Sequence, residues 1–151
     1  MEKTQIIKCE LPDYSQIPQD ILEIPKKYKK LVIVGVSHKP ERPSYIVTDY
    51  LIKQGFDVIL VNPARKEILG KKVYPSLLDI PKDYKPEIII IFRRPDMVLP
   101  IVESAIKLKP KVIWMQEGII NEEAKDLAER HGIKVIMNMC FKKIHILSKN
   151  K

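Results

Sequence analysis

Five runs of apolar, β-branched residues constrain the fold of this chain more than any other feature of its sequence. They span Leu31–Val36, Asp57–Val61, Glu87–Phe92, Lys111–Met115 and Gly132–Met137. Their almost continuous valine and isoleucine content is typical of strands that are buried on both faces, as in a parallel sheet. The sequence therefore predicts five parallel strands at the centre of the fold.

The segments between these runs carry the start and stop signals of helices. Ser44 precedes a stretch of helical apolar spacing that ends at Gly55, Asp96 precedes a second stretch, and Asn121 precedes a third that ends at Gly132. Strands that alternate with helices form right-handed crossovers. We therefore predict an α/β fold: a Rossmann-like, doubly wound, five-stranded parallel sheet with helices on both faces.

The chain divides into three parts, and its 151 residues suit a single domain. We expect an N-terminal extension over 1–30 with a short helix around Gln19–Ile24, a Rossmann-like domain over 31–145, and a basic tail over 146–151. The extension and the tail supply surface that would suit a homodimer. No apolar run reaches the roughly 20 residues that cross a bilayer, and the first residues lack the apolar stretch of a signal peptide. We therefore expect a cytoplasmic protein without a membrane partner.

Charge and cysteine content narrow the possible partners. The formal net charge of +8 favours an anionic partner, which includes nucleic acid, a nucleotide cofactor and a membrane surface. Cys9 and Cys140 are too few for a disulfide framework, and they lack the close spacing of zinc ligands. We therefore expect no metal site.

The first loop after a predicted strand has features of a phosphate site. Ligands of open α/β sheets bind beyond the carboxyl ends of the strands. Here that loop opens with Gly35 and leads into a helix N-terminus, whose free N–H groups suit a phosphate. Ser37, Lys39 and Arg42 add hydrogen-bond donors and positive charge. The loop is neither the G-x-G-x-x-G fingerprint nor a P-loop, and an ordinary strand-to-helix turn would explain it as well.

The loops after the second and third predicted strands carry cations. An NAD site usually places an acid at the end of its second strand, but here Asn62, Pro63 and Arg65 follow that strand without a carboxylate. This pattern favours a ribose with an additional phosphate, as in NADP or coenzyme A. Arg93 and Arg94 follow the third strand, and side-chain alternation favours Arg93 as the residue that faces the cleft.

The last two loops offer fewer chemical groups. Gln116 and Gly118 would line a narrow groove at the end of the fourth strand, and Glu117 has no second carboxylate or histidine close to it in the sequence. A lone cysteine such as Cys140 is more often a small buried apolar residue than a reactive thiol, although His38 could approach it in the fold. We therefore predict no catalytic residue.

From residue 31 to about 145 the chain resembles the CoA-binding domain family, which includes small stand-alone proteins. The resemblance runs, in order, through Gly35-Val-Ser37, Glu41-Arg-Pro-Ser-Tyr45, Val61-Asn-Pro63, Tyr74-Pro-Ser-Leu77, Phe92-Arg-Arg-Pro95, Trp114-Met-Gln-Glu-Gly118, Asn121-Glu-Glu and Cys140. The chain is also similar to the N-terminal domain of the succinyl-CoA synthetase alpha subunit. The active-site histidine of that enzyme lies in a further domain without a counterpart here, so the resemblance implies binding without ligase chemistry.

The resemblance implies that coenzyme A lies across the carboxyl ends of the strands. The implied site consists of Gly35, Ser37, Lys39, Arg42, Pro43, Ser44, Tyr45, Asn62, Pro63, Arg65, Arg93, Pro95, Gln116, Gly118 and Cys140. Phosphate would be held by Gly35, Ser37, Arg42 and Ser44, with Tyr45 close by, and the adenosine would be bordered by Asn62, Pro63 and Arg65. The path of the pantetheine arm would be lined by Arg93, Pro95, Gln116 and Gly118.

Three functions remain open. The leading hypothesis is a non-catalytic module that binds coenzyme A or an acyl-CoA, as a carrier, sensor or regulator. The first alternative is an enzyme of acyl-CoA or CoA-thiol chemistry that uses Cys140. The second is an NADP-binding or nucleic-acid-binding protein, in which Lys26, Lys27, Lys29, Lys30 and the basic tail would contact phosphate. Nucleic acid ranks last because we see no aromatic–basic interleaving that would contact bases, since Tyr28 alone stands among these lysines.

Overall fold

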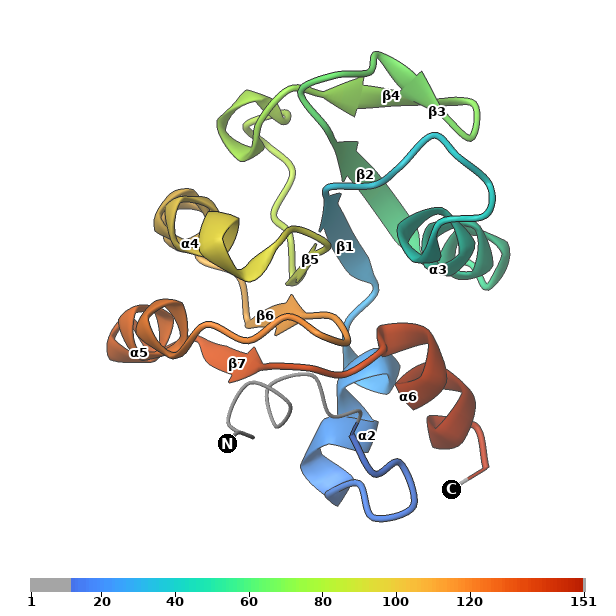
Figure 1. Cartoon of the computed structure of the whole chain (residues 1–151), viewed down its shortest axis with the longest axis vertical. Coiled ribbons are helices and arrows are strands. Elements are labelled where there is room, and N and C mark those ends of the chain that lie inside the picture. Colours follow the sequence, from blue (N-terminus) through green and yellow to red (C-terminus); the bar gives the residue numbers. More distant parts are fainter. Residues whose placement is uncertain (1–11, 151) are drawn as a thin grey trace, which may run out of the picture.

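A single seven-stranded sheet forms the centre of the protein, and the computed structural model describes residues 12–150 (Figure 1). The strands are β1 (Lys30–Val34), β2 (Asp57–Val61), β3 (Glu67–Ile68), β4 (Lys71–Tyr74), β5 (Ile88–Ile91), β6 (Val112–Met115) and β7 (Lys134–Ile136). Their order across the sheet is β3-β4-β2-β1-β5-β6-β7, and every neighbouring pair is parallel except β3 and β4. The five predicted strands and their parallel arrangement are confirmed.

The predicted strand number was wrong, because a short hairpin extends the sheet beyond β2. In this hairpin Glu67 pairs with Lys72 and Ile68 pairs with Lys71. The two turn residues, Leu69 and Gly70, both have positive φ angles, of 56° and 73°, as two-residue hairpin turns commonly require. A strand of two residues is too short to show alternation, so the sequence pattern does not predict it.

The central strand β1 is buried on both faces. Leu31 and Ile33 belong to one hydrophobic core, and Val32 and Val34 belong to the core on the opposite face. β1 pairs with β2 on one side and with β5 on the other. Burial on both faces explains why the sequence of this strand is continuously apolar rather than alternating.

Helices cover both faces of the sheet, as predicted (Figure 1). They are α2 (Gln19–Lys27), α3 (Pro43–Lys53), α4 (Val98–Lys107), α5 (Glu122–Arg130) and α6 (Phe141–Ser148), with two 3-10 turns, η1 (Leu77–Asp79) and η2 (Pro95–Met97). α2, α3 and α6 pack on one face, whereas η1, α4 and α5 pack on the other. Between residues 12 and 150, no helix is long and apolar enough to cross a membrane.

The helix starts agree only in part with the predicted capping residues. Asn121 caps α5 as predicted, because its Oδ1 accepts a hydrogen bond of 2.9 Å from the Ala124 N–H. Ser44 is not a cap: α3 begins at Pro43, and Ser44 Oγ accepts instead from the Ser37 N–H at 2.9 Å. The serine therefore braces the preceding loop rather than the helix end.

The N-terminal extension packs against the domain through its helix. Residues 1–11, including Cys9, lie outside the described residues. The predicted short helix is confirmed as α2, which packs on α6 and buries Leu22 and Ile24 in the core. An ion pair of 2.7 Å between Lys134 Nζ and Asp20 Oδ2 adds a contact with β7. The segment expected as a tail from residue 146 begins inside α6, which continues to Ser148.

Gly35 permits the close approach of two neighbouring strand ends. Its φ angle is +89°, and its N–H donates a hydrogen bond of 2.9 Å to the Val61 carbonyl. A Cβ atom at this position would lie 2.3 Å from the carbonyl oxygen of Phe92, just after β5. Only glycine satisfies both the backbone angle and the available space.

We expect the Gly35→Ala substitution to destabilise the protein by about 3–5 kcal/mol, because it adds a backbone clash to the strain of a positive φ angle. Gly55→Ala is the matched control, since Gly55 has a φ angle of +92° and a Cβ atom added there would meet nothing within 4 Å. Its cost should be only the strain of about 1–2 kcal/mol. Urea unfolding measures both changes, and equal losses in the two variants would contradict this explanation.

Candidate functional site

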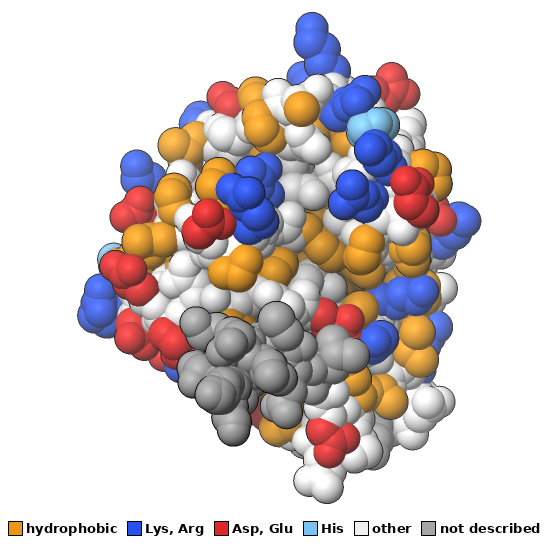
Figure 2. All heavy atoms as spheres, viewed as in Figure 1, with side chains coloured by type: hydrophobic (Ala, Val, Ile, Leu, Met, Phe, Trp, Pro, Cys, Tyr) orange, Lys and Arg blue, Asp and Glu red, His pale blue; other side chains and the backbone are white. Residues whose placement is uncertain are grey.

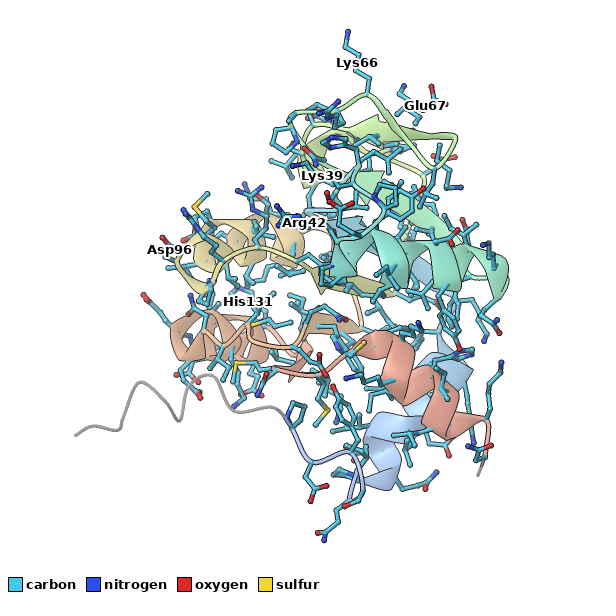
Figure 3. The ribbon with its side chains drawn as sticks, turned by 45° about the vertical axis from the view of Figure 1, so that its right-hand side comes forward. Lys39, Arg42, Lys66, Glu67, Asp96 and His131 are labelled. Atoms are coloured by element: carbon cyan, nitrogen blue, oxygen red, sulfur yellow. The ribbon has the colours of Figure 1, made fainter. Side chains whose placement is uncertain are left out.

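Basic side chains gather at the carboxyl ends of the parallel strands (Figure 2). Lys39 and Arg42 lie in the loop between β1 and α3, and Arg65 lies in the loop after β2; all three are exposed. Figure 3 shows Lys39 and Arg42 near the start of α3, whereas Lys66 points outward at the tip of its loop. The sheet therefore presents positive charge at the edge where ligands of this fold bind.

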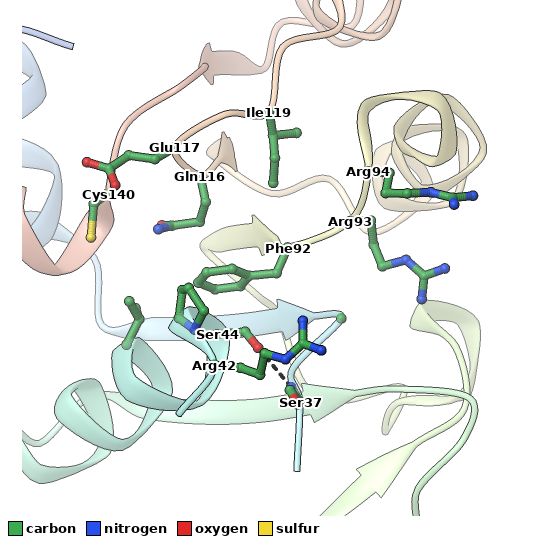
Figure 4. Close-up of a pocket in the computed structure, with 13 residues that line it drawn as sticks. Ser37, Arg42, Ser44, Phe92, Arg93, Arg94, Gln116, Glu117, Ile119 and Cys140 are labelled. Carbon is green, nitrogen blue, oxygen red and sulfur yellow. Dashed lines mark hydrogen bonds between the residues drawn. The ribbon is translucent and has the colours of Figure 1, made fainter. Parts of the chain in front are cut away.

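A pocket of about 430 Å³ opens at this edge (Figure 4). It is lined by Gly35, Ser37, Arg42, Pro43, Ser44, Val47, Phe92, Arg93, Arg94, Gln116, Glu117, Ile119 and Cys140. These residues follow β1, β5, β6 and β7, and β1 lies between β2 and β5 in the sheet. The pocket thus occupies the point at which the strand order reverses, where open α/β sheets form their ligand crevice.

One end of the pocket is formed by the loop before α3. The Ser37 N–H donates to Ser44 Oγ at 2.9 Å, and the Lys39 N–H donates to Ser37 Oγ at 3.0 Å. These bonds hold the loop against the first turn of α3, whose N–H groups lack intrahelical acceptors. Pro43, the first helical residue, has no N–H group to leave unpaired.

The two adjacent arginines differ in their surroundings. Arg94 Nε lies 3.3 Å from Asp96 Oδ1, and both side chains are more than two-thirds exposed. Arg93 lines the main pocket and also a second pocket of about 250 Å³. The Arg93 side chain therefore stands where the two pockets adjoin.

The second pocket is mainly apolar. It lies between the ends of β1 and β2 on one side and η1 and α4 on the other, and Pro63 contributes to its wall. Its lining is Val34, Val61, Pro63, Pro75, Ser76, Leu77, Arg93, Met97, Pro100, Ile101 and Ser104. A flat, apolar group of a ligand would fit such a wall better than a charged group.

Several predicted site residues line neither of these two pockets: Lys39, Tyr45, Asn62, Arg65, Pro95 and Gly118. The Asn62 side chain instead bonds to two backbones. Its Nδ2 donates to the Val36 carbonyl at 2.6 Å, in the loop after β1, and its Oδ1 accepts from the Ala64 N–H at 2.7 Å, in its own loop. Arg65 Nη2 contacts His38 Nε2 at 3.0 Å. Asn62 and Arg65 therefore interact with the loop that follows β1.

Two side chains, from β6 and the residue that follows it, hold the start of α6. Gln116 is only 4% exposed, and its Oε1 accepts a hydrogen bond of 3.0 Å from the Phe141 N–H. Trp114, fully buried in the core, donates from Nε1 to the Met139 carbonyl at 2.8 Å. Cys140 lies between Met139 and Phe141, whose backbones these two bonds hold, and immediately precedes α6. Its side chain is 7% exposed. The segment that follows the last predicted strand is therefore not a loop throughout, because α6 begins at Phe141.

Sequence reasoning missed a cluster formed by Tyr14, Glu117 and Lys143, which we call the Tyr14 cluster. Tyr14 Oη donates to Glu117 Oε2 at 2.5 Å and accepts from the Cys140 N–H at 2.8 Å. Lys143 Nζ lies 2.9 Å from Glu117 Oε2 and 5.1 Å from the centre of the Tyr14 ring. Tyr14 is 103 residues from Glu117 and 126 from Cys140, so no local pattern could reveal the cluster.

The cluster is charged at neutral pH. Burial raises the pKa of Glu117, but hydrogen bonds from Tyr14 and Lys143 and the charge of Lys143 outweigh it, so that the pKa lies below its ordinary value. The bond to Glu117 raises the pKa of Lys143, and burial together with the same carboxylate raises the pKa of Tyr14. The cluster therefore holds a carboxylate, an ammonium group and a protonated phenol, and of its three residues Glu117 lines the pocket.

The histidines have partners away from Cys140. His38 contacts Arg65, and His131 Nδ1 lies 3.0 Å from the Leu127 carbonyl oxygen. His145 Nδ1 lies 2.7 Å from Tyr50 Oη, and burial lowers the pKa of this histidine. Among residues 12–150, no group of three or more His, Cys, Asp or Glu side chains is placed to hold a metal ion.

Comparison with known families identifies the class of this protein. The family model described as "CoA binding domain" matches residues 29–146. This match covers well over half of the chain, and the chain therefore belongs to the CoA binding domain family. The resemblance that the sequence motifs indicated is confirmed, and the family suggests coenzyme A as the ligand.

Individual relatives agree with this assignment. The "Uncharacterized protein YneT" of Bacillus subtilis is 35% identical over 130 residues, which are 86% of this chain and 95% of the relative. An ADP-forming acetate–CoA ligase of Archaeoglobus fulgidus, form II, is 29% identical over 120 residues, which are 71% of this chain but 17% of the ligase. The chain thus corresponds to one part of that larger enzyme.

Solved structures show the same relationships. A hypothetical protein from Pyrococcus horikoshii OT3 is 40% identical, with a TM-score of 0.84 and 99% of each chain covered. A dinucleotide-forming acetyl-coenzyme A synthetase from Ca. Korarchaeum cryptofilum, in complex with phosphate and ADP, is 26% identical, with a TM-score of 0.64. This match covers 76% of our chain and 26% of the synthetase. The chain is homologous to the N-terminal CoA-binding domain of the ADP-forming synthetases.

Proposed function

We propose that the protein binds coenzyme A or an acyl-CoA in the cleft at the carboxyl ends of its parallel strands and does not itself catalyse a reaction. The polarity of the main pocket carries this proposal. Arg42, Arg93 and Arg94 lie at one end, and Glu117 and Cys140 lie at the other (Figure 4). Coenzyme A has the same asymmetry, since its phosphates lie near one end and its thiol terminates an uncharged arm at the other.

The phosphate groups would bind at the start of α3. The backbone N–H groups of Ser44 and Tyr45 belong to the first helical turn, where the positive end of the helix dipole favours an anion. Arg42 and Arg93 can each offer two parallel N–H groups to phosphate oxygens. Gly35 lines the pocket as well, and the lack of a side chain there lets the loop before α3 and the loop that carries Arg93 lie close enough to face one phosphate group.

The remaining parts of the ligand would occupy the two ends of the cleft. The apolar second pocket suits the adenine ring, with Pro63 in its wall and Asn62 and Arg65 at its border. The pantetheine arm would run along the main pocket toward Cys140. Gln116 points into that pocket, and because its oxygen is engaged by the Phe141 N–H, its amide nitrogen remains for a carbonyl of the arm (Figure 4).

The surroundings of Cys140 favour binding over catalysis. A nucleophilic cysteine is usually activated by an adjacent base or by positive charge. Here His38, His131 and His145 each have another partner, and the carboxylate that lines the same end of the pocket, Glu117, is engaged by Tyr14 and Lys143. The thiol would therefore serve as part of the wall rather than as a nucleophile.

Thermal unfolding with separate ligands tests the binding proposal. At one fixed salt concentration, coenzyme A at about 100 times its dissociation constant should add about 2.7 kcal/mol of stability. We expect acetyl-CoA also to stabilise the protein, and NAD, NADP and ATP to have little effect. A shift with NADP alone would indicate a dinucleotide site, and no shift with any ligand would favour a macromolecular partner such as nucleic acid.

Arginine variants locate the binding site in the same experiment. Arg42→Ala and Arg93→Ala should each weaken coenzyme A binding by about tenfold or more, because each removes charged hydrogen bonds to phosphate. Arg130→Ala is the matched control, since Arg130 is an exposed arginine in the last turn of α5. If Arg130→Ala weakens binding as strongly as the two pocket variants, the effect is one of net charge and the proposed site is wrong.

The Cys140→Ser variant separates binding from thiol chemistry. We expect coenzyme A affinity to change by less than about threefold, because the substitution keeps the size of the side chain. We also expect no mixed disulfide with coenzyme A in mass spectra of the Cys9→Ser protein after incubation with CoA disulfide. In that reaction the Cys140 thiolate would attack one sulfur of the disulfide and release coenzyme A as a thiolate. A rapid adduct that Cys140→Ser abolishes would support the enzymatic alternative instead.

A further inference from the structure

Residues from three separate parts of the chain meet at the end of the pocket opposite the arginines. Glu117 and Cys140 line this end, and Tyr14 bonds to both of them from outside the pocket. Lys143, from α6, holds the same Glu117 oxygen at 2.9 Å. The Tyr14 cluster therefore links the segment before α2, the loop after β6 and the helix that follows Cys140.

The Tyr14 segment is itself anchored, so the cluster is not a loose contact. The Tyr14 ring packs against the hydrophobic core beneath it, and α2, which follows closely in the chain, buries Leu22 and Ile24 in the same core. α2 also packs along α6, which carries Lys143. Movement of the segment away from the pocket would expose these apolar side chains and break both hydrogen bonds of the tyrosine.

Displacement of Glu117 would also be costly. Its side chain is 26% exposed, and its carboxylate receives hydrogen bonds from Tyr14 and Lys143. A partly buried carboxylate that loses such partners is left with uncompensated charge. The fixed carboxylate therefore forms a firm, charged wall at this end of the pocket.

We infer that the Tyr14 cluster makes the site selective for coenzyme A with a free thiol over long-chain acyl-CoA thioesters. This inference rests on the proposed function, which places the thiol end of the ligand near Cys140. An acyl group extends beyond the sulfur and would meet the Glu117 carboxylate, with Tyr14 and Lys143 behind it. A hydrocarbon chain can enter only if it displaces these groups or strips water from them, and both are unfavourable.

One member of the Tyr14 cluster lies outside the region that defines the family. The family model matches residues 29–146, whereas Tyr14 belongs to the extension that precedes this match. The extension therefore has a specific role: from outside the pocket, Tyr14 fixes two residues of the matched domain, Glu117 and Cys140, that line the thiol end of the site.

Isothermal titration with coenzyme A and octanoyl-CoA tests the inference. We expect the unmodified protein to bind coenzyme A at least about tenfold more tightly than octanoyl-CoA. In Tyr14→Ala the ratio of the two dissociation constants should fall toward one, because Glu117 is free to move aside. Asp13→Ala is the matched control in the same segment: the Asp13 carboxylate bonds only to the exposed Ser15 among the described residues, so the ratio should not change.

Two further variants keep the test valid if Tyr14→Ala does not fold. Tyr14→Phe retains the ring but loses both hydrogen bonds, and Glu117→Ala removes the wall while Tyr14 stays in place. Each should lower the selectivity ratio, and circular dichroism melting verifies that the variants are folded. Equal affinity of the unmodified protein for the two ligands, or an unchanged ratio in all the folded Tyr14 and Glu117 variants, overturns the inference but leaves the binding proposal intact. Failure of the unmodified protein to bind either ligand rejects both.

Discussion

The contact between the backbones of Gly35 and Phe92 is the constraint on which the site depends. It brings the ends of β1 and β5 close enough that a Cβ atom on residue 35 would overlap the Phe92 carbonyl. As a result, the loop that leads to α3 and the loop that carries Arg93 open into one pocket. The apolar pairing of β1 with β2 and β5, buried on both faces, holds this geometry in place.

A second set of interactions gives the pocket two different ends. The hydrogen bonds of Ser37 and Ser44 hold one end, where the helix dipole and the arginines provide positive potential. Gln116 and Trp114 hold the other end, because they bind the backbone on either side of Cys140. The fold thus presents cationic groups and a fixed carboxylate at opposite ends of one cleft, an asymmetry that matches a ligand with phosphates at one end and a thiol at the other.

How much of the fold and of the site could be predicted from the sequence depends on how far apart along the chain the interacting residues lie. The five central strands and the Asn121 cap were predicted correctly, because continuous apolar runs and capping residues are local signals. The β3–β4 hairpin was missed because its strands are very short, and α6 was missed because its apolar residues follow the last strand without a clear break. The Tyr14 cluster depends on tertiary contacts between distant parts of the chain, and Ser44 bonds across its loop rather than within its helix.

A crystal structure of the protein with coenzyme A is the most direct test of the central claim. We expect phosphate oxygens within hydrogen-bond distance of the N–H groups at the start of α3 and of Arg42 and Arg93. We also expect the pantetheine arm to pass Gln116 and the thiol to end beside Cys140 and Glu117. Coenzyme A bound on another surface, or in the same cleft with its thiol at the arginines, would contradict the claim.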